Sequence, residues 1–151
     1  MYHTTTYIKD KLYLFGGESG GTDLIEYNDI TKLDLGFNLL NLCNINLFIE
    51  TMEWTLIETN NNKPCPRIQH SCVLLNDDKM IIFGGKYDYQ IIDDLGISVF
   101  DSDNEQYLIV QSSDTPPNIQ FSTLVNLSKN RYLIFDEDMN SRDFLYSFVI
   151  E

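Results

Sequence analysis

The sequence has few basic residues. Lys and Arg total 10 against 23 Asp and Glu, which gives a formal net charge of −13. A surface this acidic repels phosphate backbones, so we expect no nucleic-acid partner. The charge would attract basic protein surfaces, although acidic loops also simply keep a β-rich protein soluble. Because 43% of the residues are hydrophobic, the composition excludes an intrinsically disordered chain.

Cysteines and long hydrophobic runs are also scarce. The three cysteines, Cys43, Cys65 and Cys72, are odd in number, and no basic or apolar leader segment opens the sequence. We therefore expect reduced thiols and a cytoplasmic, intracellular location. The longest uncharged apolar-rich stretch, residues 36–49, has 14 residues, whereas a membrane-spanning helix needs about 20. No membrane partner is expected.

A pattern of short apolar runs repeats along the chain. Three runs rich in Ile, Leu, Tyr and Phe end in phenylalanine: residues 11–15, 80–83 and 131–135. Such runs are typical of strands, and their continuous apolar character predicts burial on both faces. The first two are followed by the glycine pairs Gly16-Gly17 and Gly84-Gly85. A glycine pair indicates a positive φ, or a place where a Cβ atom would clash.

Further strands are expected around each of these runs. One strand is expected before each run, at residues 3–7, 70–75 and 121–127. Another is expected after each run, at residues 30–34, 97–101 and 144–150. A fourth strand, at residues 54–57 and 107–110, completes the first two units. Polar turns join the first strand of each unit to the second. Pro-bearing loops at 63–67 and 115–118 separate the units. The sequence therefore predicts an all-β chain of repeated antiparallel sheets.

The order of these features resembles the kelch repeat. The pattern consists of Pro66-Arg67, His70, Gly84-Gly85, Asp101 and Tyr107 in the second unit, and of His3, Gly16-Gly17, Asp34 and Trp54 in the first. It departs from the family at Tyr107, where kelch repeats carry Trp, and at Phe121 and Asp136-Glu137, which indicate a diverged third unit. The resemblance covers nearly the whole chain. It implies a partial kelch-type β-propeller built of four-stranded antiparallel blades.

We expect a single kelch-repeat region over residues 1–151. Blade 1 would cover about 1–59, blade 2 about 66–112, and an incomplete blade 3 about 117–151. A closed propeller has about 4–8 blades. The chain is therefore expected to be a fragment of a longer product, or to associate with copies of itself to complete the propeller.

Residues 36–49 interrupt blade 1. Asp34 and Trp54 are 20 positions apart, whereas Asp101 and Tyr107 are 6 apart. Removing the 14-residue segment restores both this spacing and a repeat period of about 50 residues. Three interpretations stay open: translated non-coding sequence, an insertion tolerated at the blade edge, or a binding element for a membrane or a partner.

Catalytic and metal sites find little support. By residue type Cys65, His70, Cys72 and His3 are possible zinc ligands, but their spacing is unlike that of a zinc site, and both histidines occupy kelch positions. As a nucleophile pair, Cys72 and His70 lack an orienting acid. Residues 101–105 begin like a calcium loop without its later glycine and glutamate, which favours a turn. We expect no catalytic residue, no metal and no cofactor.

The resemblance implies a non-catalytic protein–protein interaction module or scaffold. Its contacts with another protein would come from the loops that join strands two and three, or one blade to the next. The candidate contact residues are Glu18, Arg67, Lys86, Tyr87, Asp88 and Tyr89, among which two tyrosines beside charges are typical of binding hot spots. Arg67 has an alternative role, tying the inter-blade loop through backbone carbonyls. The alternative function is a fragment of a kelch-fold enzyme, a metal-dependent oxidase or lyase, whose active site lies outside this chain.

Overall fold

The computed structural model describes residues 1–35, 53–60, 62–88, 90–91, 97–110, 119, 121–128, 131–135 and 145–150. Within these ranges the chain forms β-strands and no helix, so the all-β prediction is confirmed. The segment 36–49 and the candidate contact residue Tyr89 lie outside the described residues.

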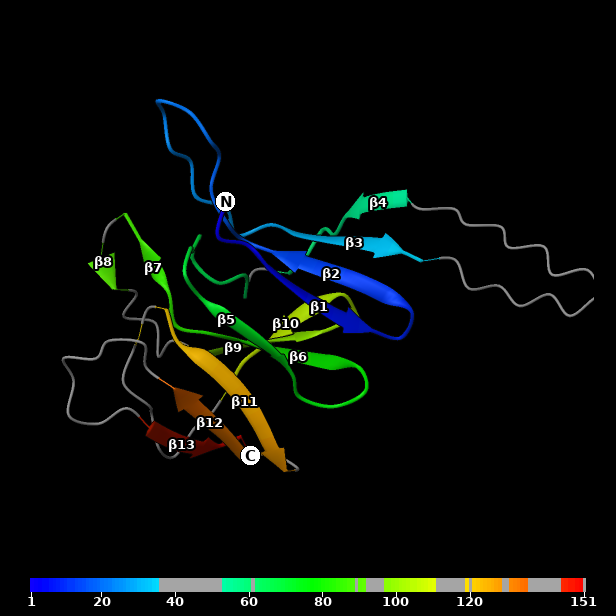
Figure 1. Ribbon diagram of the computed structural model, residues 1–151. Helices are drawn as coiled ribbons and strands as arrows, with labels where there is room; N and C mark the ends of the chain where they lie inside the picture. The colour runs from blue at the N-terminus through cyan, green and yellow to red at the C-terminus, as the bar shows by residue number, and fades with distance from the viewer. Residues whose placement is uncertain are drawn as a thin grey trace, which may run out of the picture.

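The strands form three successive antiparallel sheets (Figure 1). Blade 1 consists of β1 (Thr4–Ile8), β2 (Lys11–Phe15), β3 (Ile30–Asp34) and β4 (Glu53–Leu56). Blade 2 consists of β5 (Ser71–Leu74), β6 (Lys79–Phe83), β9 (Ile97–Asp101) and β10 (Gln106–Leu108). Blade 3 consists of β11 (Thr123–Ser128), β12 (Arg131–Phe135) and β13 (Leu145–Val149). A small hairpin, β7 (Lys86–Tyr87) and β8 (Gln90–Ile91), extends from blade 2.

The first strands of the three blades lie side by side. β5 contacts both β1 and β11, and each sheet then continues outward in chain order (Figure 1). In an antiparallel blade of this order, the connection from strand two to strand three and the connection to the next blade leave from the same end. We call this end the loop face and the opposite end the turn face. The loop at 16–29 and the β7–β8 hairpin both belong to the loop face, at the upper left of Figure 1.

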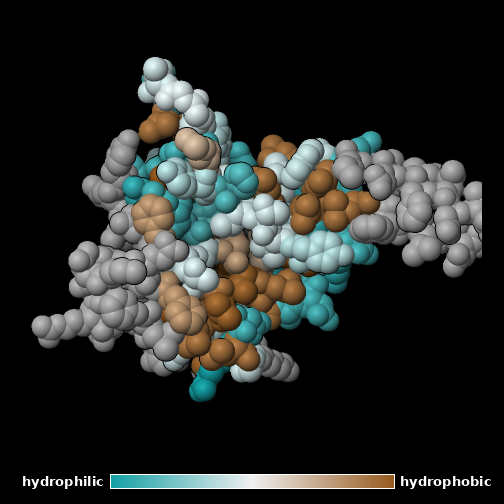
Figure 2. Space-filling model, viewed as in Figure 1, coloured by the Kyte–Doolittle hydropathy of each residue, from teal (hydrophilic) through white to brown (hydrophobic). Residues whose placement is uncertain are grey.

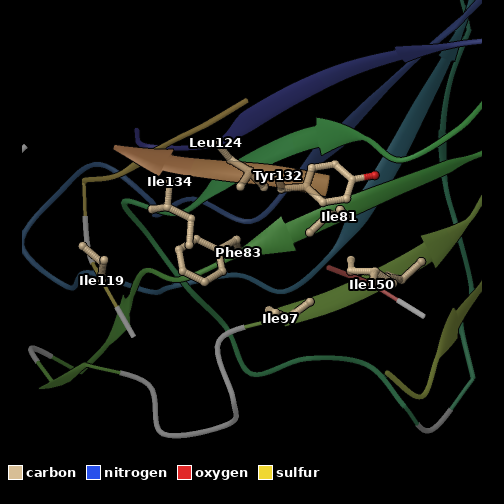
Figure 3. Packing of buried hydrophobic residues seen from close by; sticks show 9 residues of the cluster. Ile81, Phe83, Ile97, Ile119, Leu124, Tyr132, Ile134 and Ile150 are labelled. Atoms are coloured by element: carbon tan, nitrogen blue, oxygen red, sulfur yellow. The ribbon is translucent and has the colours of Figure 1, made fainter. Parts of the chain in front are cut away.

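Two hydrophobic cores hold the blades together. The core between blades 1 and 2 contains Ile8, Tyr13, Phe15, Ile30, Ile57, Met80, Ile82, Phe100 and Tyr107. The core between blades 2 and 3 contains Ile81, Phe83, Ile97, Val99, Ile119, Leu124, Tyr132, Ile134 and Ile150 (Figure 3). Because successive residues of a strand point to opposite faces, β6 supplies Met80 and Ile82 to the first core and Ile81 and Phe83 to the second.

Among the described strands, β6 of the middle blade has the longest run of residues buried on both faces. Met80, Ile81, Ile82 and Phe83 of β6 are fully buried, as the sequence predicts. For β2 and β12 the same prediction is wrong, because their burial alternates along the strand. The reason is positional: in the described structure blades 1 and 3 each pack against one neighbouring blade, whereas blade 2 packs against two.

The glycine pairs allow the entry segment of the next blade to approach. Gly84 and Gly85 have φ values of 65° and 96°, and Gly16 and Gly17 have the same two values. A Cβ atom on Gly84 would collide with the carbonyl oxygen of Ile119, and one on Gly85 would lie 2.7 Å from that of Ile68. Both physical reasons expected from the sequence, positive φ and steric exclusion, apply at these positions.

Candidate binding surface between blades 1 and 2

The loop between β2 and β3 forms an ordered hairpin on the loop face. The amide of Ser19 donates to the carbonyl of Ile25 at 2.9 Å, and the amide of Tyr27 donates to the carbonyl of Gly17 at 2.8 Å. The Ser19 hydroxyl also accepts the amide of Ile25 at 2.9 Å. These bonds leave Leu24 and Ile25 exposed near the hairpin tip.

The facing wall comes from blade 2. Ile68 and Lys86 exchange two backbone hydrogen bonds of 3.0 Å each, which fix the start of β7 beside the segment that enters β5. The amide of Asp88 donates to the carboxylate of Glu26 at 2.9 Å and so ties the two loops together across the blades. Asp88 adopts a φ of 48°, a left-handed conformation that Asp tolerates better than most residues.

Between these loops lies a hollow of about 560 Å³, which we call the inter-blade hollow. It is lined by Tyr2, Glu18, Leu24, Ile25, Glu26, Ile68, Gln69, Lys86, Tyr87 and Asp88. The lining combines exposed aromatic and aliphatic side chains with three carboxylates and one lysine. Gln69 adds a buried side-chain oxygen that has no hydrogen-bond partner. The hollow therefore combines apolar surface with an excess of negative charge.

Most of the predicted contact residues meet in this hollow. Glu18, Lys86, Tyr87 and Asp88 line it together, although they come from two different blades. Glu26, Ile68 and Gln69 lie in loops from which the kelch resemblance implies contacts, but no signal singled them out, and Tyr2 was not indicated at all. The exposed pair Leu24-Ile25 could have been identified as a contact candidate from the sequence, because two aliphatic residues follow a run of small and polar ones in a loop.

Arg67 lies elsewhere. Its side chain is fully buried, so it does not belong to the exposed surface as proposed from the sequence. Its Nε donates to the carbonyl of Cys65 at 3.2 Å, and Nη1 donates to that of Gly84 at 3.1 Å. The alternative role, tying the inter-blade loop through backbone carbonyls, is the one observed.

Thr4 bridges His70 and Cys72. Its Oγ1 lies 2.7 Å from His70 Nε2 and 2.8 Å from Cys72 Sγ. Burial raises the pKa of Cys72 to about 12, and burial together with the Arg67 guanidinium lowers the pKa of His70 to about 3. Both shifts oppose a thiolate–imidazolium pair at neutral pH, so this cluster packs the first core rather than supplying a nucleophile.

Asp101 closes the turn between β9 and β10. Its Oδ1 accepts the amides of Asp103 at 3.0 Å and Asn104 at 3.1 Å, and Oδ2 accepts Asn104 Nδ2 at 3.0 Å. Burial raises the pKa of this carboxyl, but the hydrogen bonds and the nearby Lys79 together lower it by more. The pKa therefore lies below its usual value. The carboxylate is therefore engaged in the turn, in agreement with the turn predicted at residues 101–105.

The described residues contain no group of three His, Cys, Asp or Glu side chains arranged to hold a metal ion. No helix in that part of the chain is long and apolar enough to cross a membrane.

Comparison with known proteins agrees with the blade geometry. The KLHDC2/KLHL20/DRC7 Kelch-repeats domain matches residues 1–134. Tip elongation aberrant protein 3 of Schizosaccharomyces pombe is 33% identical over 100 residues, which are 66% of this chain and 8% of that protein. Rho GTPase-activating protein gacHH of Dictyostelium discoideum is 28% identical over 127 residues, which are 84% of this chain and 6% of that protein. The chain thus spans a small part of these curated relatives. With three antiparallel sheets, paired glycines at equivalent positions and this family match, the chain belongs to the kelch-repeat family.

Proposed function

We propose that this chain is a non-catalytic protein-interaction module that binds its partner in the inter-blade hollow. Kelch repeats generally mediate protein interactions, which supports the class of function. The observation that carries the proposal is the convergence of two loops from separate blades on one hollow with apolar and acidic lining. The Asp88–Glu26 hydrogen bond holds these loops together before any partner arrives, which lowers the entropic cost of binding.

The lining defines the partner by its chemistry. Tyr87, Leu24 and Ile25 offer apolar contact area, while Glu18, Glu26 and Asp88 outnumber the one lysine in the hollow. The net charge of −13 adds a long-range attraction for cations. The proposed ligand is an exposed protein segment that carries an apolar anchor beside Lys or Arg.

A displayed library of random peptides tests this proposal. Peptides selected on the purified chain are expected to be enriched in an aromatic or aliphatic residue flanked by Lys or Arg. Replacing Tyr87 with alanine should weaken the affinity for the selected peptides by about 30-fold, because hot-spot tyrosines contribute about 2 kcal/mol. Binding should also weaken as salt is raised.

Tyr7→Ala is the matched control. Tyr7 is 52% exposed and Tyr87 is 47% exposed, but Tyr7 lies on β1, outside the hollow. Selected peptides should bind Tyr7→Ala as tightly as the unaltered chain. Peptides that bind Tyr87→Ala equally well, or a selection that enriches acidic sequences, would overturn the proposal.

A further inference from the structure

The inter-blade hollow combines two exposed tyrosines with two carboxylates that lie opposite each other. We propose that these four residues, Tyr2, Glu18, Glu26 and Tyr87, receive an arginine side chain of the partner and select arginine over lysine. We call them the cation subsite. This inference rests on the proposed function and deepens it, because it assigns the cationic part of the ligand to one residue type and to named contacts.

The two carboxylates come from one hairpin. Glu18 and Glu26 are direct antiparallel partners in the loop between β2 and β3. The backbone hydrogen bonds of the hairpin lie on either side of this pair rather than within it. In such a pair both side chains share one face, with Cβ atoms about 4.5–5.5 Å apart, and two like charges placed this way destabilise the pairing. Because both side chains line the hollow, a cation bound there relieves the repulsion.

The chain itself supplies little positive charge to this pair. Among the described residues, neither Glu18 nor Glu26 has an ion-pair partner. One oxygen of Glu26 accepts the Asp88 amide at 2.9 Å, which fixes the position of this carboxylate without neutralising it. Three carboxylates and only one lysine line the hollow, so negative charge stays in excess.

The two tyrosines reach the hollow from separate blades. Two backbone hydrogen bonds between Met1 and Glu18, of 2.8 and 2.6 Å, tie the N-terminal segment to the hairpin and so place Tyr2 beside it. Tyr87 belongs to β7 of blade 2. Their exposed fractions are 49% and 47%, and the face of an exposed ring attracts a cation. Figure 2 shows hydrophobic and hydrophilic groups next to one another around the projecting hairpin, at the upper left of the view.

Arginine suits this lining better than lysine does. Its guanidinium is planar, so it can stack on an aromatic ring while its N–H groups donate to carboxylates in pairs. The lysine ammonium is a compact, strongly hydrated charge that offers no such fork. The hollow of about 560 Å³ is also within the range of about 300–1,000 Å³ that ligand sites occupy. The cation subsite therefore matches a guanidinium in shape as well as in charge.

A peptide that was selected on the purified chain, and that Tyr87→Ala weakens, is the probe. It is synthesised in three forms that differ only at the cationic residue: arginine, lysine, or citrulline, which keeps the shape of arginine without its charge. The lysine and citrulline forms should each bind about 10-fold more weakly than the arginine form, because each loses either the fork or the charge. Isothermal titration calorimetry measures the three dissociation constants.

Variants of the chain then locate the selectivity. Glu18→Gln should lower the ratio of the lysine to the arginine dissociation constant to about 3 or less, because the facing carboxylate pair is lost. Asp23→Asn is the matched control, since it removes the same charge from the same loop, but Asp23 is exposed and does not line the hollow. It should leave the ratio unchanged. Tyr2→Ala should weaken the arginine form, whereas Tyr2→Phe, which retains the ring, should not.

Two results would overturn this inference and leave the proposed function intact: equal affinity for the arginine and lysine forms, or a preference for arginine that survives Glu18→Gln. In both cases the probe would still depend on Tyr87. A selection that yields no peptide sensitive to Tyr87→Ala would overturn the proposed function and this inference together. Circular dichroism verifies that Glu18→Gln and Tyr2→Ala are folded.

Discussion

The amide nitrogen of Gly17 donates a hydrogen bond of 3.1 Å to the carbonyl oxygen of Arg67. This bond joins the end of β2 in blade 1 to the segment that enters blade 2. The same joint recurs one blade later, where the amide of Gly85 donates to the carbonyl of Ile119 at 3.0 Å. The second glycine of each pair therefore supplies an inter-blade hydrogen bond, and the pair as a whole gives the incoming backbone room to make it.

Gly84 lies closest to the segment that enters the next blade, so a side chain there should destabilise the fold. Gly84→Ala would place a methyl group against the Ile119 carbonyl at a φ of 65°. We expect it to lower the free energy of unfolding by about 2 kcal/mol or more, since left-handed backbone costs about 1–2 kcal/mol before any clash. Gly20→Ala is the control, because a Cβ atom there meets nothing within 4 Å. Urea denaturation measures both, and equal midpoints would contradict this role for Gly84.

Even the charge-conserving substitution Arg67→Lys is expected to destabilise the fold. A lysine keeps the charge but loses the fork that reaches the carbonyls of Cys65 and Gly84 together. Arg67→Lys is expected to destabilise the fold by about 2 kcal/mol, the order of one or two hydrogen bonds to a buried charged group. Lys63→Ala removes the partly exposed Lys63–Asp29 ion pair and should have a smaller effect, below about 1 kcal/mol. If both variants unfold at the same urea concentration, Arg67 does not hold the loop.

His70 makes stability depend on pH. Burial, and then the Arg67 guanidinium, lower its pKa from 6.5 to about 3 in the folded chain. As the pH falls through 6.5, His70 therefore becomes protonated in the unfolded chain but stays neutral in the folded chain. The free energy of unfolding is therefore unaffected by this group above pH 6.5. Below pH 6.5 it decreases by up to about 1.4 kcal/mol per pH unit. Urea midpoints between pH 7.5 and 4.5 measure the slope, which should be much smaller in His70→Gln. An unchanged slope would show that another group is responsible.

The strands were predictable because each carries its own local signal. The runs at 11–15, 30–34, 97–101 and 131–135 coincide with β2, β3, β9 and β12. Their apolar side chains pack between sheets, and an apolar run can be recognised within the segment itself, without knowledge of its partners. The β7–β8 hairpin was missed because its two-residue strands are too short to show any periodicity.

The site was predictable only in part. Glu18, Lys86, Tyr87 and Asp88 were predicted as contact residues from the place of their loops in the kelch pattern, and all four line the hollow. The hollow itself depends on contacts such as Asp88 with Glu26, which lie 62 positions apart. For Arg67 the sequence left two roles open, and the structure shows the tie through backbone carbonyls; these partners carry no residue-specific signal that could have decided between the roles.

The most direct test of the central claim is to map a selected peptide onto the ¹⁵N-labelled chain by NMR. If the inter-blade hollow is the binding site, the largest amide shifts will occur at Glu18, Ile25, Tyr87 and Asp88 on the loop face. Shifts concentrated instead at Lys9 and Asp103, which form an ion pair on the turn face, would contradict the account.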